Sequence, residues 1–236
     1  MRKIAGIFWC LIIVCSLDAQ TTKPTVKSTP QQKATVSKEK LVEIKTDYGI
    51  MVVKLYDSTP LHRDNFIKLV KLGFYDSLLF HRVIEGFMIQ GGDPASKNAD
   101  STAVLGSGEA EGGMIPAEFR PHLYHKKGAL AMARTDNPEK ASSNCQFYIV
   151  QGKQYENNFL NQVECGVRQF DADFYYNDAE RKVYKTSGGT PFLDQNYTVF
   201  GEIVKGLDVV DKIAVVAKDE NDRPLKNIRM KMRLLN

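Results

Sequence analysis

The sequence predicts a mainly β fold: a closed antiparallel β-barrel of eight short strands, with two short helices. Runs of β-branched and aromatic residues recur along the chain after residue 40, and turn residues separate them. Most of these runs follow one another without a helix long enough for a crossover, which favours antiparallel pairing. Closing such a sheet removes its exposed edges, and a barrel is therefore expected.

The strands are expected in chain order. The first two runs, LVEIK and GIMVVKLY, flank Thr46-Asp47-Tyr48-Gly49, which is typical of a β-hairpin. The other six strands are predicted at residues 79–84, 87–91, 128–134, 146–150, 198–204 and 228–234.

Two helices interrupt this pattern. Residues 58–75, STPLHRDNFIKLVKLGFY, have apolar residues at helical spacing. Thr59 is predicted to cap this helix, Pro60 suits its first turn and Gly73 ends it. A second short helix is expected at residues 207–213.

The N-terminus indicates export. Arg2 and Lys3 precede an apolar run of 14 residues, 4–17. As a helix this run is about 21 Å long, shorter than the ~30 Å hydrocarbon core of a bilayer, so a stable membrane span is not expected. We therefore interpret residues 1–19 as a signal peptide, with the mature chain beginning at or near Gln20 in the periplasm.

Two alternatives remain for this segment. Cleavage before Cys15 would allow lipid attachment, but the bulky Val14 disfavours that cut. A short anchor that is never removed is a third possibility. Residues 20–40 are rich in Thr, Lys, Pro and Gln and have few large apolar side chains, so they are expected to form a flexible linker.

The charge of the chain is concentrated before the predicted domain. Of the formal net charge of +4, residues 1–40 contribute +5, which leaves −1 for residues 41–236. Nucleic-acid binding needs clustered Lys and Arg on the folded part, so this function is excluded. Cys145 and Cys165 could pair in an oxidising compartment, although the apolar strand pattern around Cys145 favours a buried thiol.

Four motifs then occur in order: FHRVIEGFMIQGGD, GALAMAR, SSNCQFYIV and TPFLDQNYTVFGEIVKGLDVVDKI. Together they resemble the cyclophilin-type peptidyl-prolyl cis-trans isomerases. The resemblance covers residues 41–236, with an interruption at residues 152–190. It implies an eight-stranded barrel capped by two α-helices, with a groove for proline-containing polypeptides on its outer surface. A monomer is expected.

The implied reaction is rotation about an X-Pro bond, whose barrier of about 18–20 kcal/mol comes from amide resonance. No bond breaks, so no nucleophile, metal or cofactor is expected. In the twisted transition state the proline nitrogen regains its lone pair, and a fixed cation beside it can stabilise that state selectively. Arg82 matches the family's catalytic arginine, and Gln90 matches the glutamine beside it.

The resemblance also implies a substrate site around these two residues. Alternation along the strands places Met88 and Gln90 on one face and Ile89 on the other, and it separates Gln146 and Tyr148 from their neighbours in the same way. His81 is expected to point to the opposite face from Arg82. The substrate-binding residues implied are Phe87, Met88, Ala133, Arg134, Gln146, Tyr148, Phe192, Leu193 and Tyr197.

The chain departs from the family's pattern at four of these positions. Phe192 stands where many members have Trp, Tyr197 where many have His, Tyr148 where Phe is commoner, and Arg134 where Asn is frequent. None of these changes removes the arginine chemistry. The missing indole does remove a donor that the family uses towards cyclosporin, so weak binding of cyclosporin is expected.

Residues 152–190 are the part that the family's pattern does not explain. Six apolar residues recur at helical spacing, which predicts one or two amphipathic helices ending at Gly188-Gly189: Phe159, Leu160, Val163, Val167, Phe170 and Phe174. This helical insertion either packs on the barrel as scaffold or flanks the groove, since groove residues precede and follow it.

The sequence therefore predicts an exported peptidyl-prolyl cis-trans isomerase that assists the folding of other exported proteins. Two alternatives stay open: a module that binds proline-containing partners with incidental catalysis, and a general chaperone.

Overall fold

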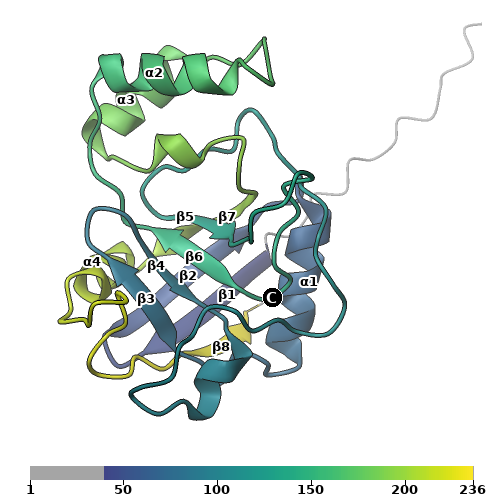
Figure 1. The fold of residues 1–236 in the computed structure, drawn as a ribbon, viewed down its shortest axis with the longest axis vertical. Coiled ribbons are helices and arrows are strands. Elements are labelled where there is room, and N and C mark those ends of the chain that lie inside the picture. The colour runs from purple at the N-terminus through teal and green to yellow at the C-terminus, as the bar shows by residue number, and fades with distance from the viewer. Residues whose placement is uncertain (1–39, 236) are drawn as a thin grey trace, which may run out of the picture. The chain divides into compact units, whose positions relative to one another are not determined.

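Eight strands form one antiparallel sheet in the computed structural model, which describes residues 40–235 (Figure 1). The predicted signal peptide, and the predicted linker up to residue 39, lie outside the described residues. All eight predicted strands form. They are β1 (Lys40–Thr46), β2 (Gly49–Leu55), β3 (Phe80–Ile84), β4 (Met88–Gly91), β5 (Ala129–Met132), β6 (Phe147–Val150), β7 (Val199–Lys205) and β8 (Lys231–Leu234).

The sheet is a curled half-barrel with the strand order β3-β4-β6-β5-β7-β2-β1-β8. The closed barrel that the sequence predicts is not confirmed, because the ladder of named strands ends at β3 and β8. In residues 40–235 the backbone between these ends forms an isolated bridge, Leu79 to Arg229. Three hydrogen bonds of 2.9 Å accompany it: Phe80 N donates to Ile228 O, Met230 N to Leu78 O and Ser77 N to Met230 O. The residues before β8 thus approach β3 without continuing the ladder.

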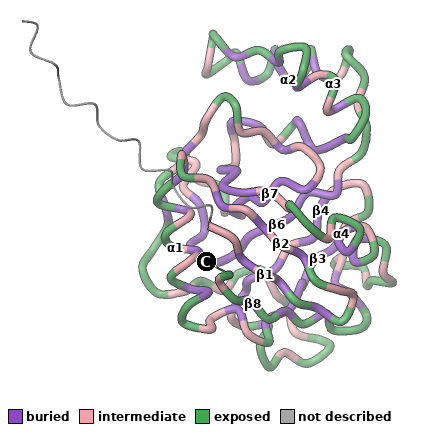
Figure 2. Tube along the Cα trace, turned by 180° about the vertical axis from the view of Figure 1, so that it is seen from behind, coloured by how far each residue is buried: buried purple, intermediate pink, exposed green. Residues whose placement is uncertain are grey.

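The core lies inside the curl, and two helices cover it. Helix α1 (Pro60–Lys71) contributes Phe66, and helix α4 (Leu207–Ala214) contributes Val210 and Ile213, all fully buried. Phe66 packs against the rings of Phe147 and Phe200, with centroids 5.6 and 5.3 Å apart. Both predicted helices are confirmed, and among the strands β5 and β6 are buried along their whole length, in contrast to the exposed surface loops (Figure 2).

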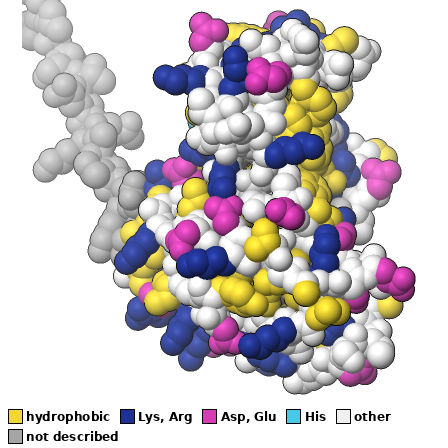
Figure 3. Space-filling view, turned by 90° about the vertical axis from the view of Figure 1, so that its left-hand side faces the viewer, with side chains coloured by type: hydrophobic (Ala, Val, Ile, Leu, Met, Phe, Trp, Pro, Cys, Tyr) yellow, Lys and Arg dark blue, Asp and Glu magenta, His cyan; other side chains and the backbone are white. Residues whose placement is uncertain are grey.

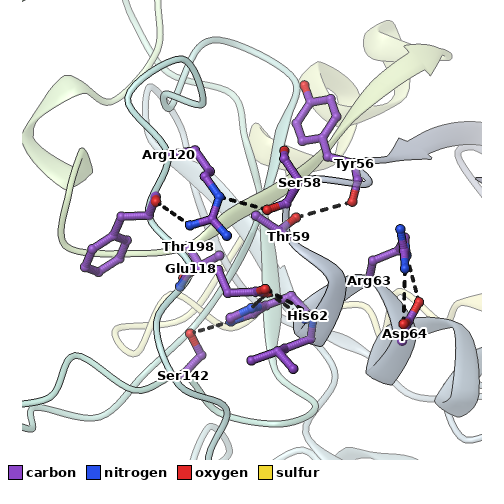
Figure 4. Close-up of polar contacts among 12 residues, drawn as sticks. Tyr56, Ser58, Thr59, His62, Arg63, Asp64, Glu118, Arg120, Ser142 and Thr198 are labelled. Atoms are coloured by element: carbon purple, nitrogen blue, oxygen red, sulfur yellow. Dashed lines mark hydrogen bonds and ion pairs between the residues drawn. The ribbon is translucent and has the colours of Figure 1, made fainter. Parts of the chain in front are cut away.

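The start of α1 differs from the sequence-based expectation. Thr59 makes no side-chain cap, and its hydroxyl donates to Tyr56 O instead. The carboxylate of Glu118 accepts the backbone amides of Leu61 and His62 at 3.2 and 3.0 Å, and it also accepts His62 Nδ1 at 2.7 Å (Figure 4). A carboxylate distant in sequence therefore satisfies the free amides of the first turn.

The insertion is helical, as predicted. It comprises α2 (Asn157–Val167) and α3 (Asp178–Thr186), which lie away from the sheet in Figure 1. A short 3-10 helix, Pro191–Leu193, follows it. The insertion has a small core of its own, formed by Leu160, Val167, Phe174, Tyr176 and Tyr184.

The two ends of the insertion meet. Gly189 bridges both Lys126 and Lys153, and a Cβ at Gly189 would lie 2.2 Å from the carbonyl oxygen of His125. A Cβ at Gly152 would lie 2.4 Å from the Cα of Gly189. Only glycine permits backbones to approach this closely, so these positions fix where the insertion leaves and rejoins the sheet.

The thiols of Cys145 and Cys165 are unpaired; Cys145 is buried, as expected, and Cys165 is exposed. Within residues 40–235, none of the helices has the length and apolar character needed to cross a bilayer.

Candidate active site

Strand alternation on β4 and β6 gives the site its outer face. Met88 and Tyr148 belong to a small apolar cluster on that face, while Ile89, Phe147 and Ile149 belong to the main core. Gln90 and Tyr148 are partners across β4 and β6. The predicted division of these residues between the two faces is confirmed.

A groove of about 710 Å³ opens on this face. Nine of the predicted site residues line it: Arg82, Phe87, Met88, Gln90, Ala133, Arg134, Tyr148, Leu193 and Tyr197. The other two lie just outside it. Gln146 is buried and bonded to the groove residues Gln90 and Gly106, and Phe192, which is 43% exposed, packs against the groove residue Phe87 with ring centroids 5.7 Å apart.

Arg82 projects from β3 beside a β-bulge, where the register between β3 and β4 shifts. Its Cα is the partner of Gln90 across the ladder. The side chain is 42% exposed, and its Nε lies 3.7 Å from Asp222 Oδ2, a distance at the outer limit for an ion pair. Asp222 is held more tightly by Lys218, at 2.6 Å. At this distance Asp222 neutralises the guanidinium of Arg82 only weakly, so the positive charge can act on a group bound in the groove.

Gln90 is oriented by Gln146. The amide nitrogen of Gln146 donates to the carbonyl oxygens of Gly106 and Gly108, at 3.0 and 2.8 Å, so its Oε1 faces away from them. That oxygen accepts Gln90 Nε2 at 3.3 Å. Because Nε2 and Oε1 belong to one planar amide, Gln90 Oε1 is directed away from Gln146.

His81 does not point away from Arg82, as simple alternation predicts, because the bulge places both residues along the groove wall. The imidazole is 96% buried, and neither ring nitrogen has a hydrogen-bond partner in residues 40–235. Burial lowers the pKa of His81 to about 4, so the ring is neutral at physiological pH.

Tyr148 forms one wall of the groove, and its hydroxyl is anchored from behind. His125 stacks beside it, with ring centroids 6.0 Å apart, and His125 Nε2 lies 2.9 Å from the Tyr148 hydroxyl. The backbone amide and Nδ1 of His125 both donate to Asp194 Oδ1, at 2.8 and 2.6 Å. In the neutral ring Nε2 is then an acceptor, and Tyr148 is the donor.

The same carboxylate is bound by the insertion. The hydroxyls of Tyr176 and Tyr184 donate to Asp194 Oδ2, each at 2.6 Å. Asp194 is 1% exposed and His125 is equally buried. A buried hydrogen-bond chain therefore joins α3 and the preceding loop to the wall of the groove, and burial raises the pKa of Tyr184 and Tyr148 well above the ordinary tyrosine value.

Arg134 and Tyr197 form the opposite rim. The guanidinium carbon of Arg134 lies 4.9 Å from the centre of the Tyr197 ring, a cation–π contact, and Arg134 Nε donates to Asn196 O at 2.9 Å. Tyr197 meets the edge of Tyr148 at 5.9 Å. The two unusual residues thus support each other.

Sequence reasoning missed several residues of the site. The loops 101–106 and 219–223 line the groove, and Asp222 approaches Arg82. These loops have no periodic pattern from which the contact could have been predicted. His125 and Asp194 lie within or beside the recognised motifs, but they contact Tyr148 only through the tertiary fold.

This arrangement supports one class of chemistry. An exposed arginine, an oriented amide and an apolar wall can hold a polypeptide and stabilise charge on a rotating amide bond. Among the residues of 40–235 that line the groove, no Ser or Cys is hydrogen-bonded to a base in the way that covalent catalysis requires. The fold and site thus define a protein that binds polypeptide and can act on its conformation.

The comparisons identify the family. The family model for cyclophilin type peptidyl-prolyl cis-trans isomerase/CLD matches residues 41–233. The chain belongs to the cyclophilin-type peptidyl-prolyl cis-trans isomerases, enzymes that catalyse isomerisation.

Curated relatives agree. A protein of Staphylococcus haemolyticus (strain JCSC1435), named as a candidate peptidyl-prolyl cis-trans isomerase, is 34% identical over 188 residues, which are 79% of this chain and 86% of that protein. A protein of the same name from Staphylococcus aureus (strain USA300) is 36% identical over 79% of this chain and 87% of its own length.

Solved structures show the same fold. A crystal structure of a cyclophilin-type isomerase from Cryptosporidium parvum superposes with a TM-score of 0.62 at 22% identity, over 84% of this chain and 99% of that one. A second crystal structure of that protein, in the presence of the dipeptide Ala-Pro, gives a TM-score of 0.61 at 23% identity, over 83% of this chain and 99% of that one.

Proposed function

We propose that Arg82 is the catalytic residue of this isomerase. The observation that carries this proposal is its position: the guanidinium lies in the groove, opposite Gln90 and at the outer limit of ion pairing with Asp222. A fixed cation beside the proline nitrogen stabilises the twisted amide more than either planar form. Arginine suits this role because it stays charged and presents its donors in a rigid plane.

Gln90 supports the reaction by binding. With its Nε2 on Gln146, its Oε1 is free to accept a substrate amide or to orient Arg82, and an uncharged amide leaves the cation unneutralised. Met88, Tyr148 and Leu193 then form the apolar socket for the proline ring. The crystal structure of the Cryptosporidium relative with Ala-Pro supports proline-containing peptides as the substrate class.

The substrates that we propose are exported polypeptides that fold slowly at X-Pro bonds. This part of the proposal rests on residues 1–19, whose pattern is that of a signal peptide. The mature chain would begin near Gln20 and act as a periplasmic monomer without lipid. Intact-mass measurement of the protein from its own host tests this, and a lipid on Cys15 would contradict it.

Catalysis is tested on the domain, residues 39–236, with an X-Pro peptide in an isomerisation assay. We expect acceleration that is unchanged by EDTA, because residues 40–235 contain no cluster of metal-binding side chains and the chemistry needs none. Arg82→Ala should lower kcat/KM by at least about 100-fold, as expected for one preorganised donor. Its stability should change little, since the side chain is 42% exposed.

The same experiment addresses the binding-module alternative. Arg82→Lys keeps the positive charge but loses the rigid fork, so it should retain peptide binding and recover only part of the rate. Full activity in Arg82→Ala would refute the catalytic role. Weak binding of cyclosporin is also proposed, since Phe192 supplies no indole donor.

A further inference from the structure

An aromatic row leads away from the proline socket into the insertion. It consists of Phe87, Phe192, Tyr155 and Phe159. The rings of Phe87 and Phe192 have centroids 5.7 Å apart, those of Phe192 and Tyr155 are 6.4 Å apart, and those of Tyr155 and Phe159 are 4.5 Å apart. Three chain segments contribute to it, and the last two rings belong to the insertion.

The row is accessible. Phe192 is 43% exposed, and the other three members are half-buried rather than closed into a core. By contrast, the apolar face of α2 that packs the insertion contains Leu160 and Val167, which are 0% and 4% exposed. In Figure 3, hydrophobic side chains gather in a band on the right of the upper half of the molecule. An exposed row of aromatic side chains next to a binding groove is typical of an interaction surface.

The position of the row along β6 decides which part of a substrate reaches it. Ala133 donates to Gln146 O at the start of β6, whereas Phe87 O accepts the amide of Gln151 just after its end. These points are five residues apart, or roughly 17 Å along a strand. Tyr148 and Met88, the socket residues, lie between them.

We propose that the aromatic row binds large apolar or aromatic side chains within the three residues that follow the substrate proline. This inference rests on the proposed function and on the direction of the substrate. The resemblance to the cyclophilin-type isomerases implies that Ala133 and Arg134 bind the residues before the proline, and both line the groove. The polypeptide then leaves the socket past Phe87 and Phe192 and reaches Tyr155.

The spacing of the row fits an extended chain. Side chains on one face of an extended peptide recur every second residue, at about 6.8 Å. The 6.4 Å between the rings of Phe192 and Tyr155 matches this repeat, so two alternate substrate side chains can each contact a ring. Contacts between aromatic rings favour such tilted and edge-on arrangements. Lys153 Nζ lies 5.6 Å from the centre of the Tyr155 ring, so a charged group borders the row beside its third ring.

The proposal is tested with peptides that contain one Phe. The set is Ala-Ala-Ala-Ala-Pro-Ala-Ala-Ala-Ala and its variants with Phe at the first, second or third residue after the proline, or at the second or third before it. Isomerisation is followed by exchange NMR with catalytic enzyme, which needs no coupled protease. We expect kcat/KM to rise at least fivefold for one or more of the peptides with Phe after the proline.

Phe159→Ala removes one end of the row without touching the groove, and alanine keeps α2 helical. It should reduce the gain from Phe at the third residue to less than twofold while leaving the all-Ala peptide unchanged. Tyr175→Ala is the matched control, because Tyr175 is an exposed aromatic residue of the same insertion outside the row. It should keep the full selectivity.

Each outcome decides between the proposals. Equal rates for all peptides, a gain only from Phe before the proline, or selectivity that survives Phe159→Ala would overturn the aromatic row as a binding site while leaving the isomerase intact. Absence of catalysis with every peptide would instead refute the proposed function itself.

Discussion

The substitution Tyr148→Phe tests whether the hydrogen bond behind the groove contributes to stability without contributing to catalysis. The change removes one hydroxyl and keeps the ring that forms the wall of the socket. In the structure that hydroxyl lies 2.9 Å from His125 Nε2, and both residues are at least 96% buried. Its loss leaves a buried imidazole nitrogen without a partner, which costs about 1–3 kcal/mol. We expect the free energy of unfolding in urea to fall by this amount.

The catalytic effect should be much smaller. The ring of Tyr148 and the position of Arg82 do not depend on the hydroxyl, so kcat/KM for a short peptide should stay within about threefold, under 1 kcal/mol in the barrier. Arg82→Ala should behave in the opposite way, with a large loss of rate and little loss of stability. A Tyr148→Phe protein with unchanged stability would refute the hydrogen-bond chain.

A double-mutant cycle tests whether the chain reaches the insertion. Tyr184→Phe removes one of the two hydroxyls on Asp194, a hydrogen bond to a charged group worth about 1.5–3 kcal/mol. Because Tyr148 and Tyr184 act through His125 and Asp194, their effects should be non-additive by at least 0.5 kcal/mol, as is typical of residues in one network. Tyr75→Phe, which removes a buried hydroxyl bonded to Cys145 O at 3.2 Å, is the control and should be additive with Tyr184→Phe.

Three further predictions concern other parts of the fold. Burial lowers the pKa of His81 to about 4, so as the pH falls the unfolded chain is protonated at His81 before the folded chain is. The free energy of unfolding should therefore fall by about 3 kcal/mol as the pH is lowered from 6.5 to 4. His81→Leu should abolish this part of the pH dependence in urea titrations. Cys145 is buried and its pKa is raised to about 11, whereas Cys165 is exposed. In the native domain a maleimide should therefore label Cys165 quickly and Cys145 only on unfolding, as followed by mass spectrometry. Cys165→Ser should remove the fast phase, and two rapidly labelled thiols would contradict the buried position of Cys145. Glu118→Gln should destabilise the domain by about 1–3 kcal/mol, because an amide cannot accept all three donors at the start of α1, while kcat/KM should be unchanged; equal stability of the variant would rule out the cap.

Local pattern was sufficient for most of the strands and for the site on them. Alternation within the motif around Gln90 put this amide and the socket methionine Met88 on one face, and the β1–β2 hairpin follows directly from its turn residues. The roles of these residues came from the family resemblance, since a strand pattern by itself does not distinguish a socket from a core.

The errors lie where distant segments meet. The start of α1 is capped by Glu118 instead of Thr59, and the bulge in β3 turns His81 into the groove wall. The closed ladder was expected because exposed edges are costly. In residues 40–235, however, an isolated bridge and three backbone hydrogen bonds join the start of β3 to the residues before β8, and no ladder of named strands does. Each of these features depends on tertiary contacts, which no window of neighbouring residues contains.

The position of Asp194 has a consequence for the order of assembly. Its carboxylate accepts donors from His125 and from Tyr176 and Tyr184, and the insertion must fold to supply the last two. Before the insertion folds, the buried carboxylate of Asp194 would lack the two tyrosine hydroxyls, which are half of its hydrogen-bond donors. Burying it in that state is costly, so the side of the groove at Tyr148 cannot reach its final structure early. A newly made chain should therefore become able to bind proline-containing peptides late in folding, after the insertion has packed over Asp194. If peptide binding is measured during refolding, the binding signal should appear later than the signal for formation of the sheet.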